Sequence, residues 1–143
     1  MAIGNNALLT QSFSNGDAVW NSDNVAVGFE ALRNNQPTQN FNGNKNTALG
    51  TQALTANTTG FGNTAGGSQA LYSNLTGDLN TASGFQALYS NTTGGSNTAS
   101  GIQALFANTK GGFNTALGNL ALLSNTTAGQ NVAIGNNALL TQS

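Results

Sequence analysis

The stretch NTASGFQALYSNTTGGS, residues 80–96, is followed directly by NTASGIQALFANTKGGF, residues 97–113. The two stretches differ at five of their 17 positions, and the same frame runs without gaps from residue 46 to residue 130. It ends on a partial copy, NVAIGNNALLTQS, at residues 131–143, and it extends back to the first residues through two copies that carry extra residues. Self-similarity at a fixed short period is the sequence signature of a solenoid.

Five positions of the repeat never change, counted from its first Asn: Asn at position 1, Ala at 3, Gly at 5, Ala at 8 and Leu at 9. Two segments of extended character, such as TALG and QALYS, alternate with glycines and Asn-Thr-Thr-Gly turns. This pattern predicts an all-β fold, a parallel β-solenoid of about eight 17-residue coils with two or three short strands in each coil. Adjacent coils of such a solenoid lie about 4.8 Å apart.

The invariant residues have physical roles in such a stack. Asn at position 1 predicts a ladder of stacked amides. Leu at position 9 is the only large residue in every coil, so we expect it to fill a narrow core between two facing sheets, beside the Ala at positions 3 and 8. Gly at position 5 is expected to supply a positive φ or a close approach of two backbones. The ladder and the leucine column comprise Asn46, Asn63, Asn80, Asn97, Asn114, Asn131, Leu54, Leu71, Leu88, Leu105 and Leu122.

Two further columns are apolar or aromatic. Position 4 alternates with the Ala at position 3, so one of the two points out of the coil, and position 4 is apolar toward both ends of the chain, as at Ile3 and Ile134. Because the core is thin, we expect this column to form the contact surface of an oligomer, with a solvated face as the alternative. Position 10 places Tyr72, Tyr89 and Phe106 in successive coils, which predicts a stacked aromatic ladder that is either structural or a strip for stacking sugars.

The composition narrows the classes of function. Charged residues make up 5% of the chain, the formal net charge is −1, and three basic residues are too few to form a patch for nucleic acid or anionic lipid. The chain has no Cys and no His, no paired carboxylates at a catalytic spacing and no phosphate-binding motif. No stretch is apolar for long enough to form a transmembrane helix, and no secretory leader is visible. We therefore expect no enzyme, no cofactor, no metal site, no nucleic acid and no membrane insertion.

The repeat is interrupted twice, by insertions at residues 13–23 and 36–45 that leave adjacent coils at the same corner. We therefore expect them to lie side by side on one edge of the solenoid. With the adjoining strands they hold the only Trp, the only Pro and five of the seven charged residues. Loops on a rigid scaffold commonly carry binding residues, although these aromatic side chains can equally cover the coil surface. The candidate ligand-binding residues are Phe13, Asp17, Trp20, Asp23, Arg33, Phe41 and Lys45.

Two alternatives come from the threonine-rich composition. Position 2 has Thr in five successive coils, which is typical of the regular hydroxyl array of an ice-binding surface, but the second threonine column, at position 14, is interrupted by Lys110. Asn-X-Ser/Thr sequons occur at Asn57, Asn74, Asn91 and Asn125, but such triplets arise by construction in an Asn- and Thr-rich repeat.

The segments NTALG, NVAIG and NTASG resemble the NSVAIG-type repeats of trimeric autotransporter adhesin heads. The longer form, NTASGFQALYSNTTGGS, is similar to repeats of phage tail-fibre and related trimeric surface-fibre proteins. The resemblance covers nearly all of the chain outside the two insertions, although the repeat here is longer than that of the autotransporters. It implies a left-handed parallel β-roll, a homotrimer around one axis, an extracellular location on a cell surface or virion fibre, and a role in adhesion or receptor binding.

The stretch AIGNNALLTQS occurs at residues 2–12 and again at residues 133–143. This identity predicts that residues 1–143 form one solenoid domain that is a segment of a longer fibre, or a subunit whose matching ends stack into a filament. We therefore expect a structural and adhesive fibre segment, with a self-stacking filament subunit as the alternative and an ice-binding protein as a less favoured one. A host-cell glycan or protein is the expected partner besides further copies of the chain.

Overall fold

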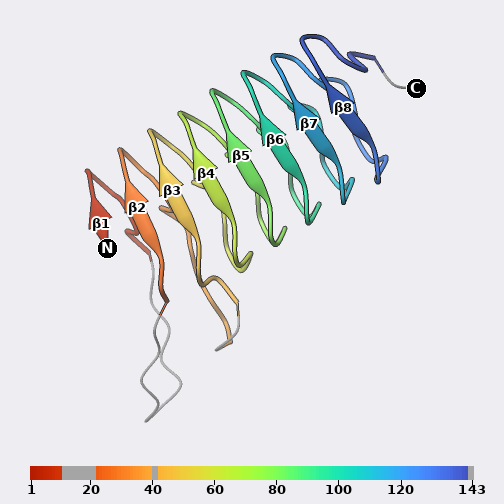
Figure 1. The fold of residues 1–143 in the computed structure, drawn as a ribbon. Coiled ribbons are helices and arrows are strands. Elements are labelled where there is room, and N and C mark those ends of the chain that lie inside the picture. The colour runs from red at the N-terminus through yellow and green to blue at the C-terminus, as the bar shows by residue number, and fades with distance from the viewer. Residues whose placement is uncertain (11–21, 40–41, 142–143) are drawn as a thin grey trace.

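A computed structural model of the protein describes residues 1–10, 22–39 and 42–141. These residues form one eight-stranded parallel sheet whose strands follow the order of the chain, which confirms the predicted parallel β-solenoid. The strands are β1 Ala2–Ile3, β2 Val25–Val27, β3 Thr47–Leu49, β4 Thr64–Gly66, β5 Thr81–Ser83, β6 Thr98–Ser100, β7 Thr115–Leu117 and β8 Val132–Ile134. Figure 1 shows a rod in which the chain winds steadily away from β1, so that the two termini lie at opposite ends. No helix occurs in the described ranges, and so none there is long and apolar enough to cross a membrane.

Each complete strand occupies positions 2–4 of the repeat, and the register between neighbouring strands is the repeat itself. Ala48 pairs with Ala65, and Ala65 pairs with Ala82, so identical residues stack along the rod. Because side chains alternate across a strand, the Ala at position 3 points inward and is buried, whereas positions 2 and 4 point outward. The predicted division of positions 3 and 4 between the inside and the outside of the coil is confirmed.

The prediction of a second strand at QALYS is wrong. In the repeat that begins at Asn80, residues 85–90 form a run of turns in which Gln86 and Leu88 have φ angles of 55° and 53°. This left-handed conformation recurs at positions 7 and 9 of the other repeats and bends the chain too often for a strand to form. Hydrogen bonds still join the turns of adjacent repeats, for example from the N–H of Leu88 to the carbonyl oxygen of Ala104 at 3.0 Å.

The core is a single column of leucines packed against small residues. The leucines at position 9 are fully buried together with the Ala at positions 3 and 8, as predicted. These leucines are Leu32, Leu54, Leu71, Leu88, Leu105 and Leu122. The core does not lie between two facing sheets, because positions 2–4 form the one sheet of the described chain and the turns supply positions 8 and 9. The stacked turns therefore take the place of the second sheet.

Glycine at position 5 makes the corner that follows each strand. Gly84 has a φ of 137°, and a Cβ added to it would lie 2.5 Å from the carbonyl oxygen of Gly101 in the next repeat. Both expected reasons for glycine therefore apply at this position, the positive φ and the close approach of two backbones.

Candidate functional site

Two ladders of asparagine side chains hold the corner of each repeat that spans positions 12–17. In the ladder predicted at position 1, the backbone N–H and the Nδ2–H of Asn63 both donate to Oδ1 of Asn46, at 2.9 and 3.1 Å. In a second ladder, at position 12, Nδ2 of Asn74 donates to Oδ1 of Asn57 at 2.9 Å. The contacts at position 1 recur in each repeat up to Asn131, which confirms the first ladder.

Both ladders converge on the backbone carbonyl at position 15. Nδ2 of Asn46 and Nδ2 of Asn57 donate to the carbonyl oxygen of Gly60, at 2.9 and 3.0 Å. The same pair of contacts recurs at the carbonyls of Gly77, Gly94, Gly111 and Ala128. A corner fixed in this way presents positions 14, 16 and 17 in the same geometry in the five uninterrupted repeats of residues 46–130.

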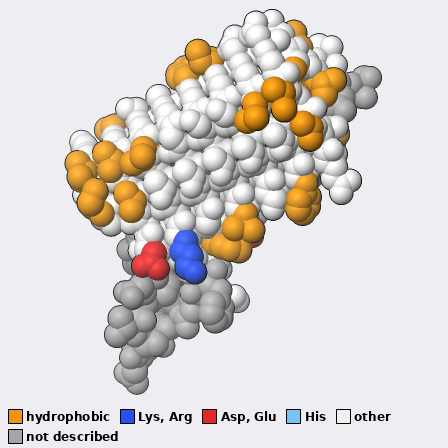
Figure 2. Space-filling model, in the orientation of Figure 1, with side chains coloured by type: hydrophobic (Ala, Val, Ile, Leu, Met, Phe, Trp, Pro, Cys, Tyr) orange, Lys and Arg blue, Asp and Glu red, His pale blue; other side chains and the backbone are white. Residues whose placement is uncertain are grey.

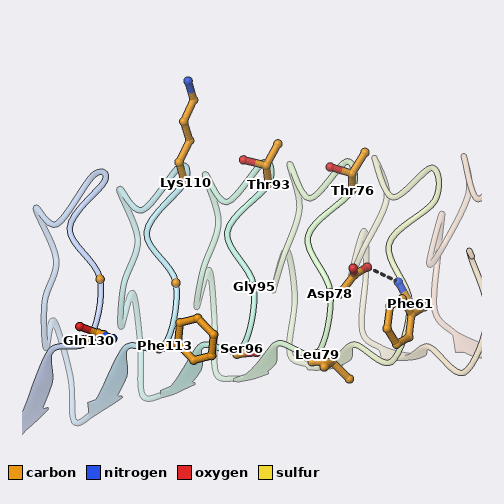
Figure 3. Close-up of a pocket in the computed structure, with 12 residues that line it drawn as sticks. Phe61, Thr76, Asp78, Leu79, Thr93, Gly95, Ser96, Lys110, Phe113 and Gln130 are labelled. Carbon is orange, nitrogen blue, oxygen red and sulfur yellow. Dashed lines mark hydrogen bonds between the residues drawn. The ribbon is translucent and has the colours of Figure 1, made fainter.

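A groove of about 680 Å³ runs along this corner over five successive repeats. Ligand sites in proteins commonly have volumes of about 300–1,000 Å³. Figure 3 shows two rows of residues along the groove: on one edge Thr76, Thr93 and Lys110, and on the other Leu79, Ser96, Phe113 and Gln130.

The floor of the groove is bare backbone, because position 16 is glycine in three consecutive repeats, at Gly95, Gly112 and Gly129. A Cβ added to Gly95 would lie 3.2 Å from the carbonyl oxygen and 3.8 Å from the nitrogen of Asp78, and a Cβ added to Gly112 would lie 3.0 and 3.8 Å from those of Gly95. A side chain at position 16 therefore covers the N–H group of the preceding repeat, and glycine leaves it open. No acceptor among the described residues bonds to the N–H of Asp78, Gly95 or Gly112.

Asp78 shows what a side chain does at position 16. Its Oδ1 accepts the backbone N–H of Phe61 at 2.9 Å, which closes one end of the floor (Figure 3). Asp78 and Lys110 are the two charged residues that line the groove, and they belong to different repeats. In Figure 3 the side chain of Lys110 extends from the threonine edge away from the floor. The groove therefore has an acidic end and a basic rim.

The residues predicted to bind a ligand fall into two groups. Four of them lie outside the described residues: Phe13, Asp17, Trp20 and Phe41. Asp23 and Lys45 are exposed and occupy position 17 of neighbouring repeats, the column to which Phe113 of the groove belongs. The backbone N–H of Lys45 donates to the carbonyl oxygen of Ser22 at 2.7 Å, so the C-terminal ends of the two insertions lie side by side.

Arg33 belongs to a different feature. Its Nη1 donates to Oε1 of Glu30 at 2.9 Å, and Oε2 of Glu30 accepts Nε2 of Gln52 at 3.0 Å. Gln52 begins a ladder of side-chain amides at position 7 that continues through Gln69, Gln86 and Gln103. Glu30 and Arg33 therefore terminate this ladder, and no described contact brings Arg33 together with Asp23 or Lys45.

The second insertion is a loop on an intact corner. Oδ1 of Asn42 accepts the N–H of Thr38 at 3.0 Å, which closes the loop on itself. The carbonyl oxygen of Gly43 accepts Nδ2 of Asn24 and Nδ2 of Asn35, both at 2.8 Å, so Gly43 takes the place of position 15. The contacts of the corner are therefore kept beside the described residues of this insertion.

The outer face of the sheet is apolar toward both ends of the rod. Ile3 and Ile134 are 55% and 69% exposed, and Leu49 and Leu117 are 47% and 36% exposed. The central repeats instead place small residues in this column, namely Gly66, Ser83 and Ser100. Figure 2 shows hydrophobic side chains at the two ends of the rod and others along its lower edge, with polar surface between them.

The predicted aromatic ladder is confirmed. The rings of Tyr72 and Tyr89 are stacked with their centroids 5.1 Å apart and an interplanar angle of 4°. The rings of Tyr89 and Phe106 are stacked at 5.2 Å and 9°. The threonine column at position 2 points outward, as the exposed first residues of β4, β5 and β6 show.

The four sequon asparagines lie inside the corner. Asn57, Asn74 and Asn91 are fully buried, and Asn125 is 1% exposed. The Nδ2 of each donates both to the carbonyl at position 15 and to the preceding side chain of its ladder. These amides are structural in the folded chain and are not presented for glycosylation.

Sequence reasoning missed the second ladder and the groove. The signal for the ladder is Asn at position 12 in six consecutive repeats, from Asn35 to Asn125. The signal for the groove is the change at position 16 from Phe61 and Asp78 to three glycines, beside the replacement of a repeat threonine by Lys110.

Comparisons of the chain with protein-family models, with curated proteins and with solved structures give no match. The function therefore has to be argued from the repeat, from its exposed surfaces and from the corner groove.

Proposed function

We propose that the protein is a structural and adhesive segment of a trimeric surface or tail fibre, without enzymatic activity, in which the solenoid is a rigid spacer and its loop-bearing edge serves recognition. The observation that carries this proposal is the hydrogen bonding between repeats, which runs through strand, turn and corner alike. A rod whose repeats are tied to their neighbours on every side resists bending, as a spacer must. The motif resemblance to trimeric fibre proteins favours the same role.

The apolar outer face of the sheet supports the trimeric part of the proposal. Ile3, Leu49, Leu117 and Ile134 are exposed in the single chain and would be buried if three chains packed through this face. The core of each chain is one leucine column, so added burial between chains would raise the stability of a thin rod. The left-handed winding and the extracellular location are the parts of the proposal that rest on the resemblance.

Light scattering coupled to size exclusion tests the assembly. The chain has a mass of 14.4 kDa, and we expect a particle of three times that mass. A double variant, Leu49→Ser with Leu117→Ser, introduces the residue that Ser83 and Ser100 already have in this column, so the fold should persist while the trimer dissociates. A parent protein that stays at the mass of one chain at every concentration would overturn the proposal. A mass that grows continuously with concentration would favour the self-stacking filament instead.

A further inference from the structure

The corner groove is elongated along the rod. Its lining residues come from five successive repeats and from the same three positions, 14, 16 and 17. With about 4.8 Å between repeats, four steps span about 19 Å. The occupant that fits this shape is an extended chain that lies along the rod axis, and a compact small molecule would leave most of the groove empty.

Three backbone N–H groups lie one repeat apart on the floor, those of Asp78, Gly95 and Gly112, and each is open because the next repeat has glycine at position 16. The equivalent N–H of Phe61 is occupied by a carboxylate oxygen of Asp78 at 2.9 Å. That contact shows which chemical group fits the three open positions. Rows of backbone N–H groups in a concave surface favour anions.

The threonine edge adds a cation to these donors. Lys110 occupies position 14, where the other repeats of the uninterrupted frame have threonine: Thr59, Thr76, Thr93 and Thr127. Lys110 belongs to the same repeat as Gly112 and lines the same groove, with its side chain extending from the rim away from the floor. The carboxylate of Asp78 lies at the other end and would repel an anion there. An acidic group of a bound chain is therefore favoured near Lys110.

The opposite edge carries two exposed apolar side chains. Phe113 is 69% exposed and Leu79 is 55% exposed. Aromatic side chains that remain exposed at the edge of a cavity provide a flat surface for an amphipathic ring. A pyranose ring has an apolar face of C–H groups and a rim of hydroxyls, and one sugar unit of an extended polysaccharide is close in length to the spacing between repeats, about 4.8 Å.

We infer that the corner groove binds an acidic linear polysaccharide, one that carries uronic acid carboxylates, with its chain along the rod axis. A carboxylate of the ligand accepts the open N–H groups of Gly95 and Gly112 beside Lys110, and a sugar ring packs on Phe113. The inference rests on the adhesive role proposed above and gives that role a ligand class and a site.

Isothermal titration of the full chain with an oligogalacturonate at low salt tests the inference, and saturable binding is expected. The variant Gly95→Asp should weaken binding at least tenfold, because it adds a negative charge to the floor beside the N–H groups of Gly95 and Gly112 that the ligand carboxylate needs. The fold tolerates Asp at position 16 in the preceding repeat, and a Cβ at Gly95 has its nearest neighbour at 3.2 Å. The matched control is Asn119→Asp, which adds the same charge at an exposed residue outside the groove and outside the position-4 column, and it should bind like the parent.

Two variants keep the test decisive if Gly95→Asp does not fold. Lys110→Thr and Phe113→Ser each introduce the residue that a neighbouring repeat has at the same position, and each should weaken binding several-fold. For Lys110→Thr, the salt dependence of the affinity should fall as well, because an ionic contact has been removed.

The control probes separate the possible ligands. Equal affinity for a neutral maltooligosaccharide would overturn the assignment of an acidic ligand, and tighter binding of a poly-glutamate peptide would identify an acidic peptide site instead. Equal loss of binding in Gly95→Asp and Asn119→Asp would place the site outside the groove. Absence of binding to every probe, with the trimer still present in light scattering, would overturn this inference and leave the fibre proposal standing.

Discussion

Asn46 and Asn57, in the same coil, donate their Nδ2–H groups to one acceptor, the carbonyl oxygen of Gly60, at 2.9 and 3.0 Å. The Oδ1 atoms of the two side chains accept hydrogen bonds from Asn63 and Asn74 of the next repeat. Buried polar groups contribute to stability only when they are satisfied, and these amides are. Beside its apolar column of leucines, the solenoid therefore has a polar core of side-chain amides that are hydrogen-bonded to one another and to the backbone.

The first prediction concerns the charge state of this polar core. Nδ2 of Asn80 donates to the carbonyl oxygen of Gly94 at 2.8 Å and to Oδ1 of Asn63 at 3.2 Å. In Asn80→Asp the new carboxylate would face both oxygens without a proton, so burial and repulsion raise its pKa above the unfolded value. The folded state then binds more protons than the unfolded state, and the free energy of unfolding falls as the pH rises through the raised pKa.

Urea unfolding between about pH 4 and pH 8 measures this dependence. Asn119→Asp is the matched control, because Asn119 is exposed at position 6 and an aspartate there stays in water. Its stability should follow that of the parent at each pH. An Asn80→Asp protein as stable as the parent at neutral pH would show that the ladder amides do not stabilise the corner.

The second prediction separates two classes of glycine. Gly84→Ala combines a φ of 137° with a Cβ only 2.5 Å from a backbone oxygen, and we expect it to prevent folding or to cost more than about 3 kcal/mol. Gly66→Ala, in the strand of the preceding repeat, meets its nearest atom at 4.0 Å and should leave the unfolding midpoint almost unchanged. Circular dichroism and thermal unfolding of both variants measure the difference. Equal stability of the two proteins would contradict the tight corner.

The parts of the fold that the sequence predicts are those in which one residue type has one physical role. Every repeat has leucine at position 9, and this is the only large side chain that all repeats share. The burial of Leu88 therefore follows from the repeat alone. The same segment was not predictable as a turn. Gln86 and Leu88 have φ angles of 55° and 53°, a region that residues with a side chain seldom adopt. Leucine adopts it here because its burial and the bonds between repeats outweigh the local strain.

The candidate site was predictable only in part, for a different reason. The insertions are visible in the sequence because they interrupt the 17-residue period. The groove instead results from the absence of side chains at Gly95 and Gly112. Every residue except proline has a backbone N–H group, so the sequence does not mark the ones that lack an acceptor. Whether such a group is covered depends on the residue that the next repeat places above it. The position of Asp78 beside the N–H of Phe61 becomes meaningful only once the repeats are stacked.

The third prediction measures the leucine column. Leu88→Ala should lower the free energy of unfolding by about 2–5 kcal/mol, because a fully buried side chain leaves a cavity in a core one residue wide. Leu75→Thr is the control: Leu75 is 43% exposed, and the neighbouring repeats have threonine at its position. Its cost should stay within about 0.5 kcal/mol. Similar unfolding curves for the two variants would mean that the column adds little to stability.

The fourth prediction concerns the aromatic ladder. Tyr89 stacks on Tyr72 on one side and on Phe106 on the other, at 5.1 and 5.2 Å. Tyr89→Thr removes both stacks and should cost about 0.5–1.5 kcal/mol for each pair beyond the loss of buried area. Tyr89→Phe keeps both stacks and should match the parent in chemical denaturation. If the two variants unfold at the same denaturant concentration, the ladder is not a stabilising feature.

The last prediction removes the second insertion. Replacing residues 37–42 by a single threonine restores a 17-residue repeat, and the corner contacts survive because Gly43 already accepts Nδ2 of Asn24 and of Asn35 at 2.8 Å. The shortened chain should keep its circular dichroism spectrum and unfold within a few degrees of the parent, since short changes in loop length alter the closure entropy little. Loss of the fold would show that the loop is part of the core. If the shortened chain binds oligogalacturonate like the parent while Gly95→Asp does not, recognition resides in the groove; if the shortened chain alone loses binding, it resides in the loop.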